Sequence, residues 1–202
     1  MPISALMVDV DGVLVSGRPS DGGHWQKSLH ADLGVDPAVF NERFFAPHWG
    51  DIVIGRSDIM AHLPAVLESI APQLTADALL KYWFTHDARV VTPLLDEIAR
   101  ARAAGVRVYL ASNQEHRRAT YLMETLGLAR HVDGMYHSAQ LGAKKPTAAY
   151  FAAVQGAVNI AADELLLLDD TLENVEAARV AGWQALHWTD AMVPESLRTL
   201  YR

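Results

Sequence analysis

The sequence of 202 residues contains no cysteine. This absence excludes disulfide bonds, a thiol nucleophile and thiolate metal sites, so a bound ion would have to use oxygen or imidazole ligands. The chain has 24 aspartate and glutamate residues. Because carboxylate oxygens suit hard cations, Mg²⁺ is the ion that this supply of ligands fits best.

Long apolar runs and clusters of basic residues are also missing. No apolar stretch approaches the roughly 20 residues that a membrane span needs. The first residues lack a charged segment followed by a small-residue cleavage site. No lysine or arginine run exceeds a pair and the formal net charge is −7, which argues against nucleic acid and anionic membrane surfaces as partners. We therefore expect a cytoplasmic enzyme; its oligomeric state stays open.

The second half of the chain alternates between apolar runs and helical patterns. Half of all residues are apolar and a fifth are charged, which suits one α/β domain with a substantial insertion. Uniformly apolar strands separated by helices are typical of a parallel sheet that is covered on both faces. We predict a doubly wound, Rossmann-like parallel sheet. The expected strands are the opening run before Asp9 and residues 106–111, 135–137, 165–168 and 185–188, with helices at 92–105 (Thr92 as N-cap), 116–126, 147–154 and 173–181.

Residues 16–90 have a different character. A loop rich in glycine and serine is followed by helical patterns that contain many aromatic residues and histidines. We predict an α-helical cap subdomain at 16–90, inserted into a core formed by 1–15 and 91–202. Its expected helices are 37–45, a segment capped by Ser57 that runs towards Ile70 with Pro64 as an interruption, and 76–84 capped by Thr75.

Polar residues follow three of the expected strands. Because the carboxyl ends of parallel strands meet at one edge of a sheet, these residues should lie close together. An acid pair alone often only caps a helix or lies in a solvated turn, so the convergence is the informative feature. Close carboxylates raise one another's pKa unless a cation neutralises them. The three groups are Asp9 and Asp11 before Gly12, Ser112 with Asn113, and Asp169 with Asp170.

These residue types supply every role of a phosphoryl-transfer site. A carboxylate that attacks phosphorus forms an acyl phosphate, and a second carboxyl group protonates the leaving oxygen and then activates water. Asp9 and Asp11 can divide these two roles. The other candidates are Asp170, with Asp169, for a metal; Lys145 for charge balance; and the Ser112 hydroxyl with nearby backbone N–H groups for phosphate oxygens.

The same segments resemble the haloacid dehalogenase superfamily of hydrolases. Four of its motifs stand in the family's order over nearly the whole chain. They are Val8-Asp9-Val10-Asp11-Gly12-Val13-Leu14, the apolar run that ends in Ser112-Asn113, Gly142-Ala143-Lys144-Lys145-Pro146, and Asp169-Asp170 followed by Asn174.

This resemblance implies a role for each motif residue. Asp9 would be the nucleophile and Asp11 the general acid and base. Mg²⁺ would be held by Asp9, Asp170 and the backbone carbonyl of Asp11, with Asp169 either a ligand or a neighbour of one. Phosphate would be bound by Ser112, Asn113, Gly12 and Lys145, the last being the motif lysine because it precedes Pro146, whereas Lys144 is expected to be solvated.

The resemblance also implies an activity. The helical insertion is similar to the small cap of the superfamily's first subclass, and the acidic pair with Asn174 resembles the variant that contains glucose-1-phosphate phosphatase and the N-terminal phosphatase of epoxide hydrolase. The dehalogenase branch lacks an acid at the position of Asp11. We expect a Mg²⁺-dependent phosphatase of small phosphorylated metabolites, such as sugar phosphates, with a phosphomutase or a catalytically idle binding protein as alternatives.

Contacts with the rest of the substrate are expected from the cap. Packing or simple surface exposure would also explain the presence of each candidate residue in the cap. Arg56 is the best candidate for a second anion contact. The cap candidates are His24, Trp25, His48, Trp49 and Arg56, and we expect His116, Arg117 and Arg118 on a solvated helix face, with Tyr121 and Met123 packed.

Overall fold

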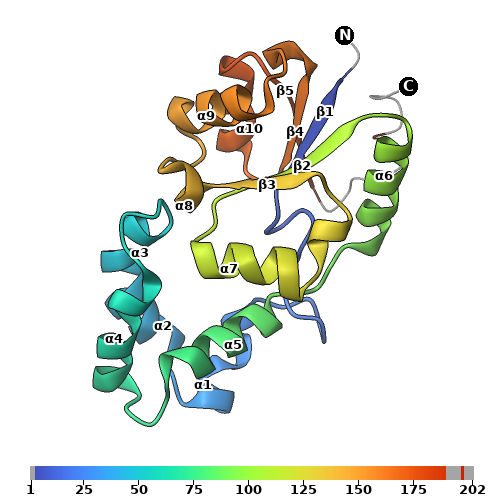
Figure 1. Cartoon of the computed structure of the whole chain (residues 1–202). Helices are drawn as coiled ribbons and strands as arrows, with labels where there is room; N and C mark the ends of the chain where they lie inside the picture. Colours follow the sequence, from blue (N-terminus) through green and yellow to red (C-terminus); the bar gives the residue numbers. More distant parts are fainter. Residues whose placement is uncertain (1–2, 190–196, 198–202) are drawn as a thin grey trace.

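A five-stranded parallel sheet forms the centre of the fold (Figure 1). The computed structural model describes residues 3–189 and residue 197. The strand order is β3-β2-β1-β4-β5: the chain starts in the middle, builds one side and then returns to build the other. This confirms the predicted doubly wound sheet. The strands are β1 (Ala5–Val8), β2 (Arg107–Ser112), β3 (Gly134–His137), β4 (Leu165–Asp169) and β5 (Gln184–His187).

Side chains alternate between two apolar layers, one on each face of the sheet. Leu6 and Val8 of β1 pack in one layer, with α6 (Thr92–Ala103). Ala5 and Met7 pack in the other, with α9 (Ala148–Val158) and α10 (Leu172–Val180). Because both faces are covered, the strands can be uniformly apolar. None of the helices within the described residues has the length and apolar character needed to cross a bilayer.

Several element ends in the core differ from the predictions. Thr92 is the first residue of α6, and Val91 occupies the N-cap position without a side-chain cap. Pro93 lies in the first turn, as predicted. The predicted helix at 116–126 is α7 (His116–Thr120) continued by the π-helical segment Tyr121–Thr125. A short helix, α8 (Ser138–Leu141), was not predicted.

The insertion is helical, as expected, and its helices lie together at one end of the molecule (Figure 1). It buries its own apolar cluster, separate from the two layers of the sheet. The boundaries of the two subdomains stay a prediction. The helices are α1 (Leu29–Leu33), α2 (Pro37–Phe40) continued by the π-helical segment Asn41–Phe45 into α3 (Ala46–Ile52), α4 (Leu63–Ile70) and α5 (Ala76–His86).

The start of α4 corrects one predicted helix cap. Ser57 does not cap the segment; its Oγ is 2.8 Å from Nε2 of His62. Asp58 caps a short 3₁₀ turn instead, with its Oδ1 accepting from the N–H of Met60 at 2.7 Å. Pro64 lies in the first turn of α4, where its missing N–H costs nothing, so it is not an interruption. The predicted cap by Thr75 is confirmed.

Candidate active site

Three carboxylates gather at the carboxyl end of the sheet. Asp9 follows β1, Asp169 ends β4, and Asp170 is the next residue. One oxygen atom from each of the three lies within 4.8 Å of the others. The predicted convergence of these acids is therefore observed, and hard oxygen ligands of this kind are able to hold a divalent cation.

Lys145 is buried among these acids, with 2% of its surface exposed. Its Nζ lies 3.1 Å from Oδ1 of Asp9 and 2.5 Å from Oδ2 of Asp169. Asn113 fixes the backbone of the lysine, because its Nδ2 donates to the Lys145 carbonyl at 3.0 Å and its Oδ1 accepts from the Lys145 N–H at 2.8 Å. The Asn113 side chain, which the resemblance assigns to phosphate, thus holds the lysine. Lys144 is exposed, as predicted.

Asp169 already has hydrogen-bond partners on both carboxylate oxygens. Oδ1 accepts from the N–H of Thr171 at 2.9 Å and from Nδ2 of Asn174 at 3.0 Å, while Oδ2 faces Lys145. Asp170, in contrast, is exposed. The two neighbouring acids therefore have different surroundings: Asp169 is held within the protein, and Asp170 faces outward.

Burial and charge shift the pKa values of this cluster. Burial raises the pKa of Asp9 to about 6, with Lys145 opposing the rise and Asp169 adding to it. Burial alone would lower the pKa of Lys145, but Asp9 and Asp169 raise it above its ordinary value. The lysine is therefore cationic. The cluster contains three carboxylates and one ammonium group, and a divalent cation would balance the remaining negative charge.

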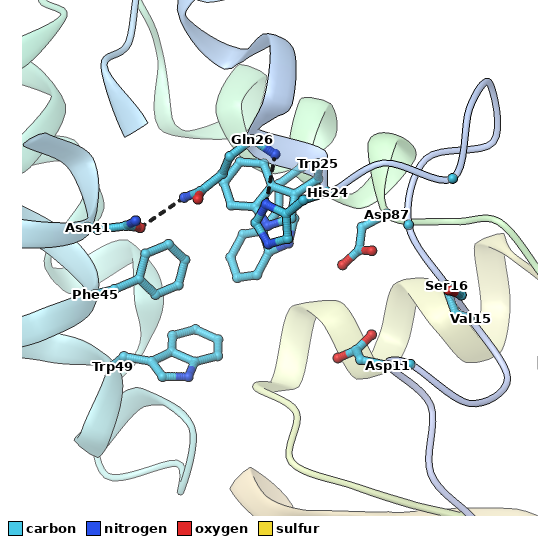
Figure 2. A pocket seen from close by; sticks show the side chains of 14 residues that line it. Asp11, Val15, Ser16, His24, Trp25, Gln26, Asn41, Phe45, Trp49 and Asp87 are labelled. Carbon is cyan, nitrogen blue, oxygen red and sulfur yellow. Dashed lines mark hydrogen bonds between the residues drawn. The ribbon is translucent and has the colours of Figure 1, made fainter. Parts of the chain in front are cut away.

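Asp11 lies in a different environment from Asp9. Its Oδ2 accepts from Nε2 of Gln114 at 2.6 Å, and its Oδ1 is 3.7 Å from Nη2 of Arg118. Its side chain keeps 51% of its surface exposed because it faces a cavity under the cap (Figure 2). Loss of bulk water around it raises the pKa of Asp11, and Arg118 opposes that rise.

Gly12 is the residue that allows the chain to leave β1 beside Asp170. Its φ of +81° is in the left-handed region, and its N–H donates to the Val15 carbonyl at 2.8 Å. A Cβ at this position would lie 2.1 Å from Oδ2 of Asp170. The backbone conformation therefore favours glycine, and any other residue here would also displace the Asp170 carboxylate.

Arg118 corrects a prediction, because it is not on a solvated face. It is 1% exposed, and its Nη1 donates to the Phe84 carbonyl at 3.1 Å. Its Nη2 donates to the Asp87 carbonyl and lies 3.4 Å from the Asp87 carboxylate. The guanidinium group also lies over the ring of Tyr121, 5.6 Å from its centroid. Arg118 thus joins α7 and the end of α5 to Asp11.

Two cavities meet at Asp11 and Gly12. The smaller, of about 370 Å³, is lined by these two residues and by Asp9, Ser112, Lys145 and Asp170, among others. The larger, of about 630 Å³, lies under the cap and is called the cap cavity below (Figure 2). Besides Asp11, Gly12 and the loop residues Val15, Ser16, Gly17 and Gly22, its lining consists of Trp25, Phe45, Trp49, Trp83, His24, Gln26, Asn41 and Asp87.

The cap residues singled out from the sequence divide into two groups. His24, Trp25 and Trp49 line the cap cavity. His48 and Arg56 do not: the ring of His48 stacks on that of His62, and the exposed Arg56 lies 3.6 Å from Asp51. The position of Arg56 therefore does not support the second anion contact that was expected of it.

Comparison with known proteins places the chain in a family. A family model of haloacid dehalogenase-like hydrolases matches residues 3–182. The chain belongs to this family. The predicted hydrolase class is thereby confirmed, and the four motifs that carried the resemblance fall inside the matched range.

The curated relatives of this haloacid dehalogenase-like hydrolase are named as phosphatases. A phosphoglycolate phosphatase of Mesorhizobium japonicum is 26% identical over 186 residues, which cover 88% of this chain and 78% of the relative. A phosphatase of Mycobacterium tuberculosis is 26% identical over 196 residues, 92% of this chain and 87% of that protein. A sesquiterpene phosphatase of Aspergillus oryzae is 35% identical over 106 residues, so about half of each chain is matched (52%).

Solved structures show the same fold. A haloacid dehalogenase family enzyme of Bacteroides thetaiotaomicron has a TM-score of 0.80 at 18% identity, over 98% of this chain and 99% of that one. The same enzyme in complex with magnesium and inorganic phosphate has a TM-score of 0.78, also at 18% identity, over 94% and 96%. At this level of identity, the likeness confirms the fold of the hydrolase.

Two residues near Asp11, Gln114 and Asp87, were not singled out from the sequence, and a third, Arg118, was expected in solvent. Gln114 follows the second motif directly, and its position after a strand end was a usable signal. Arg118 precedes the buried Leu122 by four residues, which places both on one helix face. Asp87 carried no such signal, because its place depends on how α5 ends beside α7.

Proposed function

We propose that this chain is a Mg²⁺-dependent phosphatase that hydrolyses small phosphorylated metabolites through an aspartyl phosphate on Asp9. The observation that carries the proposal is the gathering of Asp9, Asp169 and Asp170 within 4.8 Å, beside the buried ammonium group of Lys145. The phosphatase names of the relatives and the magnesium and phosphate complex of a structural neighbour support it.

Asp9 and Asp170, together with the backbone carbonyl of Asp11, would hold the metal. Asp169 is better suited to fix Lys145, because its oxygens already accept hydrogen bonds from Thr171 and Asn174. When bound, Mg²⁺ would lower the repulsion between the phosphate group and the carboxylates.

Asp9 is oriented for attack on phosphorus. Its Oδ1 accepts from the N–H of Val10 at 2.7 Å and faces Lys145, so the carboxylate is held on one side. Attack by Oδ2 on the phosphate ester would form the acyl phosphate and release the alcohol, and water would then hydrolyse this intermediate. Ser112 and Lys145, which line the smaller cavity, would bind the phosphate oxygens.

Asp11 would act as the general acid and then the general base. It lies where the two cavities meet, between the phosphate side and the leaving-group side. Its raised pKa favours the protonated form that can donate to the leaving oxygen. Gln114 and Arg118 hold its carboxyl group in place.

The direct test measures inorganic phosphate released from a panel of phosphorylated metabolites. We expect release in the presence of Mg²⁺, loss of release when EDTA is in excess, and recovery when Mg²⁺ is restored. Isomerised hexose phosphate without free phosphate would instead identify a phosphomutase. Lack of turnover with every ester in the panel would contradict an enzymatic role.

Replacing Asp11 with asparagine should slow turnover according to the leaving group. With alkyl phosphates we expect kcat to fall by about 10²- to 10⁴-fold, the usual contribution of a general acid. The loss should be smaller with p-nitrophenyl phosphate, because p-nitrophenolate leaves without a proton. Asp36→Asn is the matched control, since Asp36 caps α2 with an oxygen that asparagine also provides. Equal losses for both kinds of ester would contradict the role of Asp11.

A further inference from the structure

The cap cavity has an aromatic wall built from separate segments of the cap. Trp25 stacks on Trp83, with ring centroids 5.1 Å apart and an angle of 18° between the planes. Phe45 packs edge-on against Trp83 at 5.6 Å, and against Trp49 at 5.2 Å. Each ring holds the next in position, so the wall is pre-formed. Figure 2 shows Phe45 and Trp49 across the cavity from Asp11 and Asp87.

The lining of the cap cavity contains more acidic residues than basic ones. Among the described residues that line it there is no lysine or arginine, whereas Asp11 and Asp87 are both present. His24 is its only histidine within that lining, and its Nδ1 accepts from the N–H of Gln26 at 3.3 Å. A carboxylate in the leaving group would therefore face Asp11 and Asp87, whose cationic partner, Arg118, is already shared between them.

The arginines of the neighbouring segments are engaged elsewhere. Arg18 binds Asp21 through Nε at 2.9 Å and through Nη2 at 2.6 Å. Arg89 lies outside the lining, where its Nε donates to the Ser16 carbonyl at 2.8 Å. Arg118 is paired with the two acids of the cavity. The Arg89 guanidinium group lies beside Gly22, and none of these three arginines is part of the aromatic wall.

Gln26 and Asn41 are uncharged polar side chains of the lining. Nε2 of Gln26 donates to Oδ1 of Asn41 at 2.9 Å. This hydrogen bond orients the Gln26 oxygen, which is an acceptor, and the Asn41 amino group, which is a donor. Such groups can meet a hydroxyl group but cannot neutralise a charge. A volume of about 630 Å³ is ample for a small organic leaving group.

We propose that the cap cavity selects phosphate esters whose leaving alcohol is uncharged and presents an apolar face, and that it discriminates against leaving groups that carry a carboxylate. The inference rests on the proposed phosphatase function, because it assumes an ester whose phosphate lies at Asp9 and whose alcohol extends past Asp11. Both a hydrocarbon chain and the apolar face of a sugar ring satisfy this chemistry. Phosphoglycolate, after which a relative is named, does not.

The test compares kcat/KM for geranyl phosphate, glucose 6-phosphate and phosphoglycolate with Mg²⁺ present, and uses acetyl phosphate to report on the phosphatase chemistry alone. We expect at least one uncharged ester to exceed phosphoglycolate by about tenfold or more, as discrimination through unpaired polar groups allows. Whichever of geranyl phosphate and glucose 6-phosphate is the better substrate shows whether the leaving alcohol is a hydrocarbon chain or a sugar. If acetyl phosphate is hydrolysed but phosphoglycolate is as good a substrate as the uncharged esters, or a better one, this inference alone is overturned. If no ester is hydrolysed, the phosphatase function is overturned as well.

Two variants locate the selectivity in the cap cavity. Trp49→Ala removes part of the aromatic wall and should lower the ratio of kcat/KM for the preferred ester to that for phosphoglycolate by about tenfold. Gln26→Lys, at a partly buried position of the lining, adds a cation and should raise the ratio of kcat/KM for phosphoglycolate to that for the preferred ester. Selection by this cavity would be contradicted if neither Gln26→Lys nor Trp49→Ala changed kcat/KM for the preferred ester relative to that for phosphoglycolate.

Discussion

Replacing Asp9 with asparagine is expected to lower phosphate release by about 10⁴- to 10⁶-fold, the range seen when a catalytic nucleophile is removed. An amide cannot attack phosphorus as a carboxylate does, so the aspartyl phosphate cannot form. The substitution keeps the size of the side chain, and the amide oxygen can still accept from the N–H of Val10. We therefore expect the variant to remain folded, with a cooperative thermal transition close to that of the parent.

Two measurements separate loss of the nucleophile from general damage. Incubation with a labelled acyl phosphate should leave label on the parent protein after acid quenching, but not on Asp9→Asn. Asp36→Asn is again the matched control, because it makes the same chemical change at a helix cap outside the site. Turnover by Asp9→Asn within about tenfold of the parent would refute Asp9 as the nucleophile.

Replacing Lys145 with methionine is expected to reduce both stability and activity. The ammonium group lies between Asp9 and Asp169, and its removal leaves two buried carboxylates without their cation. Breaking a buried ion pair in this way typically lowers the free energy of unfolding by about 3 to 5 kcal/mol. Turnover should fall by about 100-fold or more, because a charged contact to the phosphate oxygens is lost as well. Urea denaturation and phosphate release measure the two effects.

Lys144→Met provides a control one residue away. Lys144 is exposed, so this change should alter the free energy of unfolding by no more than about 0.5 kcal/mol. The double variant Lys145→Met with Asp169→Asn should recover part of the lost stability, since it removes one unpaired charge, but not the activity. Equal stability of Lys145→Met and Lys144→Met would show that the buried ammonium group does not balance the acids.

Local patterns in the chain predicted the elements of the core well. Uniform apolar runs located the five strands to within about two residues, which is the usual uncertainty of element ends. Two of the errors fell at helix starts. Thr92 and Ser57 both have the side chain of a good cap, but the observed turns begin one residue away, at Val91 and Asp58. Capping residues are favoured at several neighbouring positions, and only the packed chain selects one.

The site was predictable where it depends on strand ends, and not where it depends on contact between the cap and the core. Asp9, Asp170 and Lys145 were expected together because they follow parallel strands or precede a motif proline, and they lie together. Arg118 was expected in solvent but is buried against the end of α5. No local pattern reports that contact, because its two sides are more than 30 residues apart in the chain.

By itself, the sequence determined the parallel sheet, the helical insertion and the acids that meet at the edge of the sheet. The physical reason is that periodicity and strand direction are local properties, and strand direction decides which ends meet. Only the tertiary structure decided the surroundings of each acid and the composition of the cap cavity. Those depend on side chains that approach from distant segments, where burial and neighbouring charge, rather than residue type, decide what each carboxylate can do.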